Sequence, residues 1–174
     1  MSPESHQLTF EGERPGADAR RDVVVVYSDG GARGNPGPAA IGAVVLDPST
    51  EPPATLASVS RRIGVTTNNV AEYEALIAGL EAAQPFRART VRVRADSQLL
   101  IRQLEGRYKV KHAGLRPLHA RARALLADYD HVDLMHVPRE HNTVADALVN
   151  AALDGAPDAV SDAAPDTAPG TDGS

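Results

Sequence analysis

One buried strand constrains this chain more than any other feature. Residues 23–29 read VVVVYSD, in which four valines and a tyrosine run directly into Ser28 and Asp29. A continuous β-branched run of this kind is typical of a strand buried on both faces, at the centre of a sheet. The expected strand ends at the carboxylate of Asp29, and a glycine-rich stretch follows. Because ligands of open α/β sheets bind beyond the carboxyl ends of the strands, Asp29 lies where a site is expected. The alternative is that Asp29 simply begins a turn.

The bulk composition limits the kinds of site that the chain can hold. At 174 residues, we expect one domain with a core large enough to fold without covalent staples. The sequence has no cysteine, which excludes disulfides, thiolate metal sites and cysteine nucleophiles. No apolar run approaches the roughly 20 residues of a membrane span, and no signal pattern is present. We therefore expect a cytoplasmic protein with no membrane partner.

The net charge of −5 is unevenly distributed along the chain. Residues 154–174 hold five aspartates and no basic residue. Between Arg102 and Arg123, in contrast, seven basic residues stand against one acid, Glu105. Such a stretch predicts a surface that binds phosphates, and the alternative is a solvated helix face.

Hydrophobic periodicity predicts a mixed sheet with helices packed on it. The expected strands are 23–29, 40–46, 54–63, 90–95 and 131–137. The expected helices run from the cluster at 66–69 to about 83, over 97–105, over 115–129, and to about 153 from Asn142. Asn142 is the expected cap of the last helix, and Asp96 or Ser97 that of the second. This order predicts an α/β fold. Polar composition assigns 1–21 to a disordered segment and 154–174 to a disordered acidic tail or interdomain linker, which leaves 22–153 as the folded domain.

Four acids stand out by their positions in these elements. Asp29 ends the first strand and Asp96 follows the fourth, so parallel pairing of these strands would bring both carboxylates to one end of the sheet. Glu72 and Asp146 lie near the first turns of two helices. Four carboxylates in one crevice need a counter-charge, and Mg²⁺ or Mn²⁺ prefers such oxygen ligands. Helix capping or a favourable charge at a helix N-terminus would explain single acids, but not their joint arrangement.

Four segments carry a resemblance to a known family. They read SDGGARGNPGP, TTNNVAEYEAL, RADSQLLI and HNTVADALVNAA, in this order and spacing. Together they resemble type 1 ribonuclease H over residues 23–153. The resemblance implies the ribonuclease H-like fold, with a five-stranded mixed sheet of order 3-2-1-4-5 flanked by helices. It also implies endonucleolytic cleavage of the RNA strand of RNA–DNA hybrids, which leaves 3′-hydroxyl and 5′-phosphate ends.

The resemblance also assigns roles to the four acids. Asp29 would bridge two metal ions, Mg²⁺ or Mn²⁺, when substrate is bound. Asp146 would hold the ion that activates the attacking water, and Glu72 with Asp96 the ion at the leaving 3′ oxygen. Two such ions stabilise both oxygens of an in-line displacement. His141 matches the family's mobile histidine, which would help proton movement or product release. The short VPREHN connection departs from the longer glycine-containing loop of many relatives, and an exposed turn histidine is the alternative.

Substrate contacts follow from the same resemblance. The side chains that would contact the hybrid's sugars and phosphates are Asn35, Thr67, Asn68 and Asn69. A turn role for Asn35 and capping by the other three are compatible with this. Many relatives carry a long basic protrusion rich in tryptophan, whereas this chain has no tryptophan and only GRYKVKHAG, residues 106–114, in its place. The basic side chains left to contact the DNA strand's phosphates are Arg107, Lys109 and Lys111.

Other functions fit the sequence less well. A 3′–5′ exonuclease of this fold would place two acids on the first strand as Asp-x-Glu, whereas Asp29 is followed by two glycines. A non-catalytic binding module would be expected to lose at least one of the four acids. A P-loop would need Gly-Lys-Ser/Thr after its glycines. We expect a monomer, and a C-terminal phosphatase-like domain, as in some bacterial relatives, if the native chain continues past Ser174.

Overall fold

The run of valines forms a central strand, as its composition predicts. The computed structural model describes residues 20–162. The strands are β1 (Val23–Ala32), β2 (Gly37–Asp47), β3 (Ala54–Thr66), β4 (Thr90–Ala95), β5 (His131–His136) and β6 (Ala159–Asp162). The helices are α2 (Asn68–Ala83), α3 (Gln98–Leu104), α4 (Arg116–Leu126) and α5 (Thr143–Leu153), with 3₁₀ turns η1 (Gln84–Phe86) and η2 (Arg139–His141).

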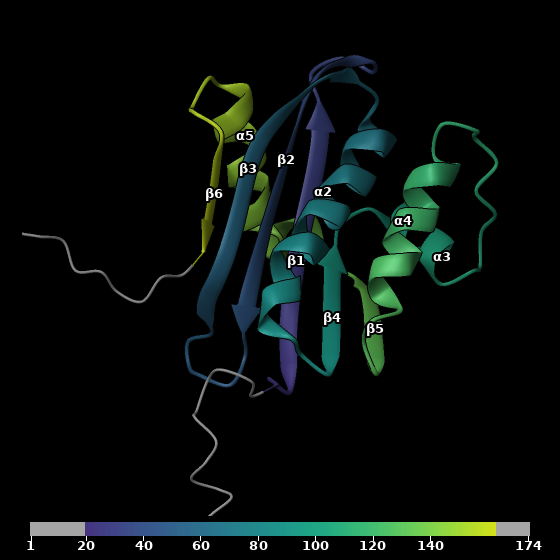
Figure 1. Ribbon diagram of the computed structural model, residues 1–174. Helices are drawn as coiled ribbons and strands as arrows, with labels where there is room; N and C mark the ends of the chain where they lie inside the picture. Colours follow the sequence, from purple (N-terminus) through teal and green to yellow (C-terminus); the bar gives the residue numbers. More distant parts are fainter. Residues whose placement is uncertain (1–19, 163–174) are drawn as a thin grey trace, which may run out of the picture.

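The sheet has six strands, in the order β5-β4-β1-β2-β3-β6 (Figure 1). β1 pairs antiparallel with β2 and parallel with β4, and β4 pairs parallel with β5. Parallel pairing brings the carboxyl ends of β1 and β4 to the same edge of the sheet. The expected order 3-2-1-4-5 is retained within the observed sheet, but the expected number of five strands is wrong.

The additional strand is β6, which pairs antiparallel with β3 from Ser60↔Ala159 to Ala57↔Asp162. The sequence assigns residues 159–162 to a disordered acidic tail or an interdomain linker, whereas these four residues form a strand, so disorder is wrong for them. A segment this short has no periodic pattern of its own, and its strand conformation comes from backbone pairing with the edge of β3. Residues 1–19 and 163–174 lie outside the described residues, so the disorder expected there stays a prediction.

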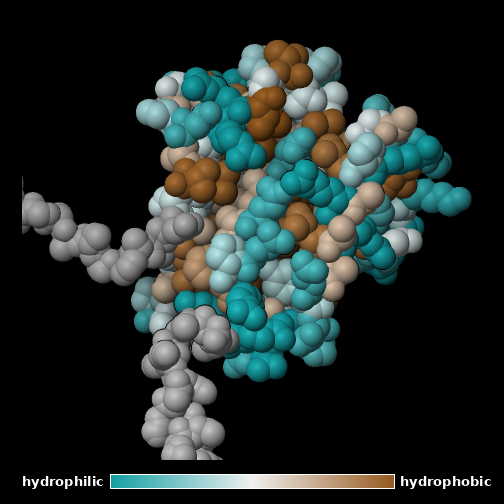
Figure 2. Space-filling view, viewed as in Figure 1, coloured by the Kyte–Doolittle hydropathy of each residue, from teal (hydrophilic) through white to brown (hydrophobic). Residues whose placement is uncertain are grey.

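Helices cover both faces of the sheet. α2 packs against β1, β2 and β3 on one face, and α4 packs against α2 (Figure 1). The main core lies between the sheet and these helices. It contains Val24, Val26, Tyr73, Leu76 and Leu80, each 2% exposed or less. α5 packs against β2, β3 and β1 on the opposite face. Hydrophilic residues predominate on the surface seen in Figure 2, with hydrophobic residues in separate smaller patches.

Both strands of the first hairpin are longer than their hydrophobic runs. β1 continues past Asp29 because Gly30, Gly31 and Ala32 still pair with β2, and the turn closes with Arg33 N donating to Pro38 O at 2.8 Å. The expected end of the strand at Asp29 is therefore three residues early. Asp29 lies within a paired strand, which fixes its backbone more firmly than a turn would.

Caps set where the next helices begin. The Thr67 hydroxyl accepts a hydrogen bond from Val70 N at 3.2 Å, and the Ser97 hydroxyl accepts one from Leu100 N at 3.1 Å. Ser97 rather than Asp96 therefore caps α3, which leaves the Asp96 carboxylate for another role. Within residues 20–162, no helix has the length and apolar character needed to cross a membrane.

Candidate active site

All four acids singled out from the sequence line one cleft of about 590 Å³. They come from four different elements: Asp29 from β1, Glu72 from α2, Asp96 from the residue after β4, and Asp146 from α5. Two faces of the sheet contribute, because α2 and α5 cover opposite sides. The cleft thus lies at the sheet edge where β1 and β4 end together.

A missing side chain at Gly30 brings α2 close to β1. A Cβ atom at Gly30 would lie 2.1 Å from Ala71 O and 2.7 Å from Glu72 N. Real Cβ atoms do not make such contacts, so only glycine allows the helix backbone to approach β1 this closely. Gly30 directly follows Asp29, and Ala71 directly precedes Glu72. The close approach therefore places these two carboxylates beside one another.

Gly42 has the same role for α5 on the other face. It lies directly opposite Asp29 in the β1–β2 pairing, so both residues face α5. A Cβ atom at Gly42 would lie 2.4 Å from Ala145 O. Because Ala145 precedes Asp146, this approach brings Asp146 to Asp29. The buried Asn142 fixes the start of α5, since its Nδ2 donates to Ser28 O at 2.9 Å.

The role of Asn142 differs from the expected one. It occupies the N-cap position of α5, but its side chain makes no capping hydrogen bond. The residue is 1% exposed, and its side-chain amide donates a hydrogen bond to Ser28 O of β1 instead. The expectation that its side chain caps the helix is therefore wrong, and the residue ties α5 to the strand that carries Asp29.

Asp29 is the most strongly perturbed acid of the cleft. It is 8% exposed, and burial, followed by the charges of Asp96, Asp146 and Glu72, raises its pKa to about 8. Burial also raises the pKa of Glu72, against a hydrogen bond from Ser97 and the charge of Arg139, which lower it. Carboxylates that resist ionisation in this way mark a place where positive charge is missing.

The oxygens in the cleft suit a hard divalent cation. Asp96 Oδ2 is buried and accepts no hydrogen bond from the described residues, and the Arg139 guanidinium approaches it only to 3.9 Å. Carboxylate oxygens are the ligands that Mg²⁺ and Mn²⁺ prefer. Among residues 20–162, no group of three or more His, Asp or Glu side chains is arranged to hold one metal ion. Mg²⁺ usually binds through one or two carboxylates together with waters and substrate phosphates, so it does not need such a group.

The predicted sugar-contacting residues gather where the first hairpin meets α2. Asn68 Oδ1 accepts a hydrogen bond from Ala32 N at 2.8 Å, and Asn35 Oδ1 accepts one from Asn68 N at 3.0 Å. Asn68 lines the cleft, whereas Asn35 and Asn69 are exposed beside it. Thr67 caps α2. These contacts fix the hairpin turn against the start of the helix.

Comparisons with known proteins agree with this geometry. Residues 27–152 match the family described as reverse transcriptase-like. The chain is 48% identical over 132 residues to the bifunctional protein Rv2228c of Mycobacterium tuberculosis, and 47% identical over 130 residues to ribonuclease HI of Halobacterium salinarum. Each match covers 75% of this chain, but 35% of the first relative and 64% of the second. The chain thus spans about a third of the length of the mycobacterial relative.

Solved structures match over almost their whole length. The N-terminal RNase H domain of Rv2228c is 48% identical, with a TM-score of 0.71, over 76% of this chain and 99% of that one. RNase H1 of Halobacterium salinarum is 46% identical, with a TM-score of 0.71, over 77% and 99%. LC11-RNase H1, solved in complex with an RNA/DNA hybrid, is 46% identical, with a TM-score of 0.69, over 75% and 96%.

The chain belongs to the type 1 ribonuclease H family. Ribonucleases H of this family depend on divalent metal ions in general, which agrees with the oxygen donors of the cleft. The resemblance noted in the four sequence segments is confirmed. The roles of individual residues stay predictions.

The structure does not bring His141, the candidate for the ribonuclease H histidine, into the cleft. His141 is exposed in η2 and lines a separate cavity of about 200 Å³ with Tyr27, Val44 and Val144 among others. Arg139, at the other end of the same turn, lines the cleft instead. Sequence reasoning did not single out Arg139 or Arg33, which also lines the cleft, because an isolated arginine in a loop carries no local signal.

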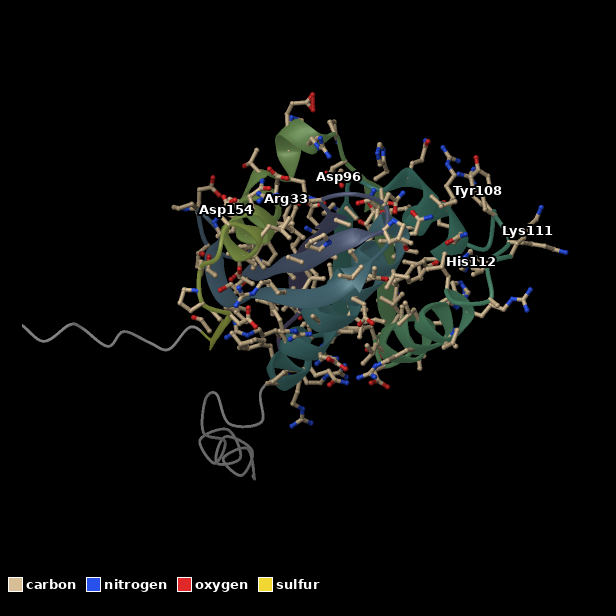
Figure 3. The ribbon with its side chains drawn as sticks, turned by 90° about the horizontal axis from the view of Figure 1, so that it is seen from above. Arg33, Asp96, Tyr108, Lys111, His112 and Asp154 are labelled. Carbon is tan, nitrogen blue, oxygen red and sulfur yellow. The ribbon has the colours of Figure 1, made fainter. Side chains whose placement is uncertain are left out.

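The basic connection, residues 106–114, lies in a short loop between α3 and α4, as expected from the sequence. Arg107, Lys109 and Lys111 are exposed on it, and Arg107 lies 3.6 Å from Glu105. In the view from above, Lys111 projects from the molecule beside His112, on the opposite side from Arg33 (Figure 3). Arg116, at the start of α4, holds the loop backbone by donating to Val110 O and Lys111 O at 3.3 and 3.4 Å. These three side chains do not line the cleft.

Proposed function

We propose that this chain is an endoribonuclease that hydrolyses the RNA strand of RNA–DNA hybrids and leaves 3′-hydroxyl and 5′-phosphate ends. The observation that carries the proposal is the convergence of Asp29, Glu72, Asp96 and Asp146 on one cleft. Family membership and the hybrid complex of LC11-RNase H1 support it. No nucleophilic side chain is needed, because water can displace the 3′ oxygen directly.

The same four carboxylates would hold the metal ions, with Asp29 shared between two ions, Asp146 at one of them, and Glu72 with Asp96 at the other. Bound Mg²⁺ or Mn²⁺ would stabilise the charge on the attacking and leaving oxygens. The raised pKa of Asp29 supports this, because a carboxyl that resists ionisation alone is ionised readily next to a cation. The buried Asp96 Oδ2, which accepts no hydrogen bond from the described residues, supports it as well.

Other side chains would orient the hybrid around the cleft. The side chains that would contact the RNA strand's 2′-hydroxyls are Asn35, Thr67, Asn68 and Asn69, because amide and hydroxyl groups can both donate to and accept from a hydroxyl. Arg107, Lys109 and Lys111 would contact phosphates of the DNA strand from the neighbouring loop. The sugar contacts would favour a hybrid over duplex DNA, because duplex DNA has no 2′-hydroxyl groups.

The remaining expectations concern the whole protein. A monomer in the cytoplasm, and a C-terminal phosphatase-like domain after Ser174, stay predictions. The name of the mycobacterial relative, a bifunctional protein of which this chain matches 35%, supports the second of these. Sequencing the reading frame beyond Ser174 tests it: an immediate stop codon would end the idea of a following domain.

A gel assay on end-labelled RNA–DNA hybrid tests the activity. Wild type, Asp29→Asn and Asp133→Asn, an exposed β5 acid that does not line the cleft, are compared with Mg²⁺, with Mn²⁺ and with EDTA. We expect internal cuts in the RNA strand of the hybrid only, lost with EDTA and in Asp29→Asn but retained in Asp133→Asn. Duplex DNA, duplex RNA and single-stranded RNA serve as controls. Hybrid binding without cleavage in the presence of either metal would refute the proposed nuclease activity.

A further inference from the structure

One ion pair joins the turn of the first hairpin to the end of α5, beside the cleft. Arg33, in the turn of the first hairpin, reaches from its loop to Asp154, and its Nη2 lies 2.7 Å from Asp154 Oδ1. Arg33 lines the cleft together with Asn150 and Leu153 of the last turns of α5. Seen from above, Arg33 lies between Asp154 and Asp96, which is part of the carboxylate cluster (Figure 3).

Arg33 is presented by a firmly held backbone. Its own N–H donates to Pro38 O at 2.8 Å, and the preceding N–H, of Ala32, donates to Asn68 Oδ1 at 2.8 Å. The loop is thus tied both to itself and to the start of α2. A guanidinium on such a loop is pre-positioned at the cleft, so little backbone freedom is lost when it binds an anion there.

Asp154 is an unusual residue to find in its position. It is the C-cap of α5, where the helix dipole disfavours a negative charge. The Arg33 guanidinium offsets this repulsion. Asp154 does not line the cleft, and both side chains of the pair are about half exposed or more, at 51% and 64%. Asp154 therefore neutralises Arg33 from outside the cleft, in an ion pair that water and other anions can reach.

The charges of the cleft show why this pair matters. Its described lining contains four acids and two basic residues, Arg33 and Arg139. Arg139 lies next to Asp96 and lowers the pKa of Glu72, so its charge is directed at the carboxylates. Arg33 has no partner among those carboxylates. Among its guanidinium donors, only Nη2 makes a hydrogen bond to a described residue, which leaves Nη1 and Nε available to an incoming phosphate.

We propose that Arg33 is a substrate-positioning residue that exchanges Asp154 for a backbone phosphate of the RNA strand, next to the phosphate that is cleaved. This rests on the proposed function and extends it to a specific contact. In the free protein, the Asp154 carboxylate accepts one hydrogen bond from Nη2 of the guanidinium. When the hybrid binds, the phosphate replaces it, because two phosphate oxygens accept from two donors of the arginine fork, whereas Asp154 engages one. Asp154 therefore competes with the hybrid for Arg33 and weakens hybrid binding.

Hybrid binding as a function of salt tests the exchange. Fluorescence anisotropy with a labelled hybrid and Mg²⁺ is measured in an Asp29→Asn background, so that the RNA strand stays intact. We expect Arg33→Gln to raise Kd about three- to tenfold and to reduce the slope of log K against log salt by roughly one. Arg33→Lys keeps the charge and should retain most of the slope. Asp154→Asn should lower Kd about two- to fivefold, since an exposed ion pair of modest strength is removed.

The chain contains a matched control pair. Arg62 and Asp158 form an ion pair of similar exposure, 52% and 48%, which does not line the cleft. Arg62→Gln and Asp158→Asn should leave both Kd and the salt slope near wild type. Thermal unfolding of every variant shows whether the fold is retained.

The exchange predicts that Kd for the hybrid rises in Arg33→Gln and falls in Asp154→Asn. A merely structural ion pair would not change Kd in opposite directions in the two variants. An unchanged salt slope in Arg33→Gln, or an Asp154→Asn variant that binds as wild type or more weakly, would overturn the proposal. The gel assay on the wild type tests the nuclease activity independently of the Arg33–Asp154 exchange. If the wild type cleaves but Arg33→Gln binds normally, this exchange fails and the nuclease stands.

Discussion

At the scale of single residues, the central fact is the carboxyl group of Asp29. It is buried in a paired strand, with three other acids around it, and its pKa is raised to about 8. The metal-free protein therefore holds a proton there that the unfolded chain, with a pKa of about 4, has already released at neutral pH. The same arrangement that weakens the folded protein without metal is the one that would attract divalent cations.

This arrangement predicts how stability depends on pH. Because the folded-state pKa lies above the unfolded one, the folded protein binds more protons between about pH 4 and pH 8, and its free energy of unfolding falls as the pH rises through that range. Asp29→Asn removes the titrating group. In EDTA we expect the variant to be more stable than wild type at pH 8, by on the order of 3–5 kcal/mol, and nearly equal at pH 4.

Thermal unfolding in EDTA across this pH range measures the effect. Adding Mg²⁺ should then stabilise the wild type more than the variant, since only the intact carboxylate set binds the ion fully. A variant less stable than wild type at every pH would contradict the assignment of the raised pKa.

A second prediction separates two residues of the same 3₁₀ turn. Arg139 lines the cleft and its charge lowers the pKa of Glu72, whereas His141 lines another cavity. We expect Arg139→Gln to reduce kcat/KM about tenfold and to move the acid limb of the pH–rate profile to higher pH, because Glu72 then ionises less readily. His141→Gln should stay within about twofold of wild type. The reverse order of effects would restore His141 to the role that the family resemblance assigns to it.

At the scale of elements, the site depends on how closely two helices approach the sheet. Gly30 and Gly42 face opposite sides, and each leaves room for the backbone of a helix, α2 or α5. The acid that follows the contact residue in each helix, Glu72 or Asp146, is thereby carried to Asp29. Helix packing and the assembly of the carboxylates are thus the same event.

Adjacent glycines provide a direct test of this packing. A Cβ atom at Gly30 would lie 2.1 Å from Ala71 O, whereas at Gly31 the nearest atom, Val149 Cγ1, would be 3.9 Å away, an ordinary contact. We expect Gly30→Ala to destabilise the protein by about 2–4 kcal/mol in urea unfolding, and Gly31→Ala to change stability by about 1 kcal/mol or less. Equal effects of the two substitutions would show that α2 adjusts freely, contrary to the packing described.

The elements also show what the sequence can predict and what it cannot. The strand Thr90–Ala95 follows from its local pattern, so its prediction succeeds. The two helix starts follow from local patterns as well, and the structure selects Thr67 from the cluster at 66–69 and Ser97 from the pair Asp96 and Ser97. β6 has no such pattern, because pairing with a distant edge strand creates it. Asn142 reads as a cap, yet a buried contact with Ser28 claims its amide.

The same limit applies to the site. Four acids at element ends are visible in the sequence, because each end has its own local signal. The two arginines of the cleft are not, since only the folded loops bring Arg33 and Arg139 to it.

At the scale of the whole molecule, β6 changes the outline of the sheet. It covers the backbone of β3 between Ala57 and Ser60, and the Arg62–Asp158 ion pair lies beside this pairing. An uncovered edge strand offers unpaired N–H and C=O groups to other chains. The segment after α5 therefore protects one border of the sheet, while β5 forms the other border of the described sheet.

Removing this cover should change how the protein associates. We expect a chain that ends at residue 157 to retain the fold and hybrid cleavage, but to self-associate at concentrations where a chain ending at residue 162 is monomeric. Sedimentation velocity compares the two, with urea unfolding as a check on stability. Identical sedimentation of both chains at high concentration would show that the β3 edge needs no cover.

The register between β1 and β2 also decides where this chain can change length. Asp29 lies opposite Gly42, and inserting one residue in either strand would turn one partner to the other face. Such an insertion would abolish the site even if the core repacked. The exposed connection at residues 48–53 joins β2 and β3 at the far end of the sheet from the cleft. That connection is where a reporter peptide or affinity tag can be spliced into the chain without disturbing its chemistry.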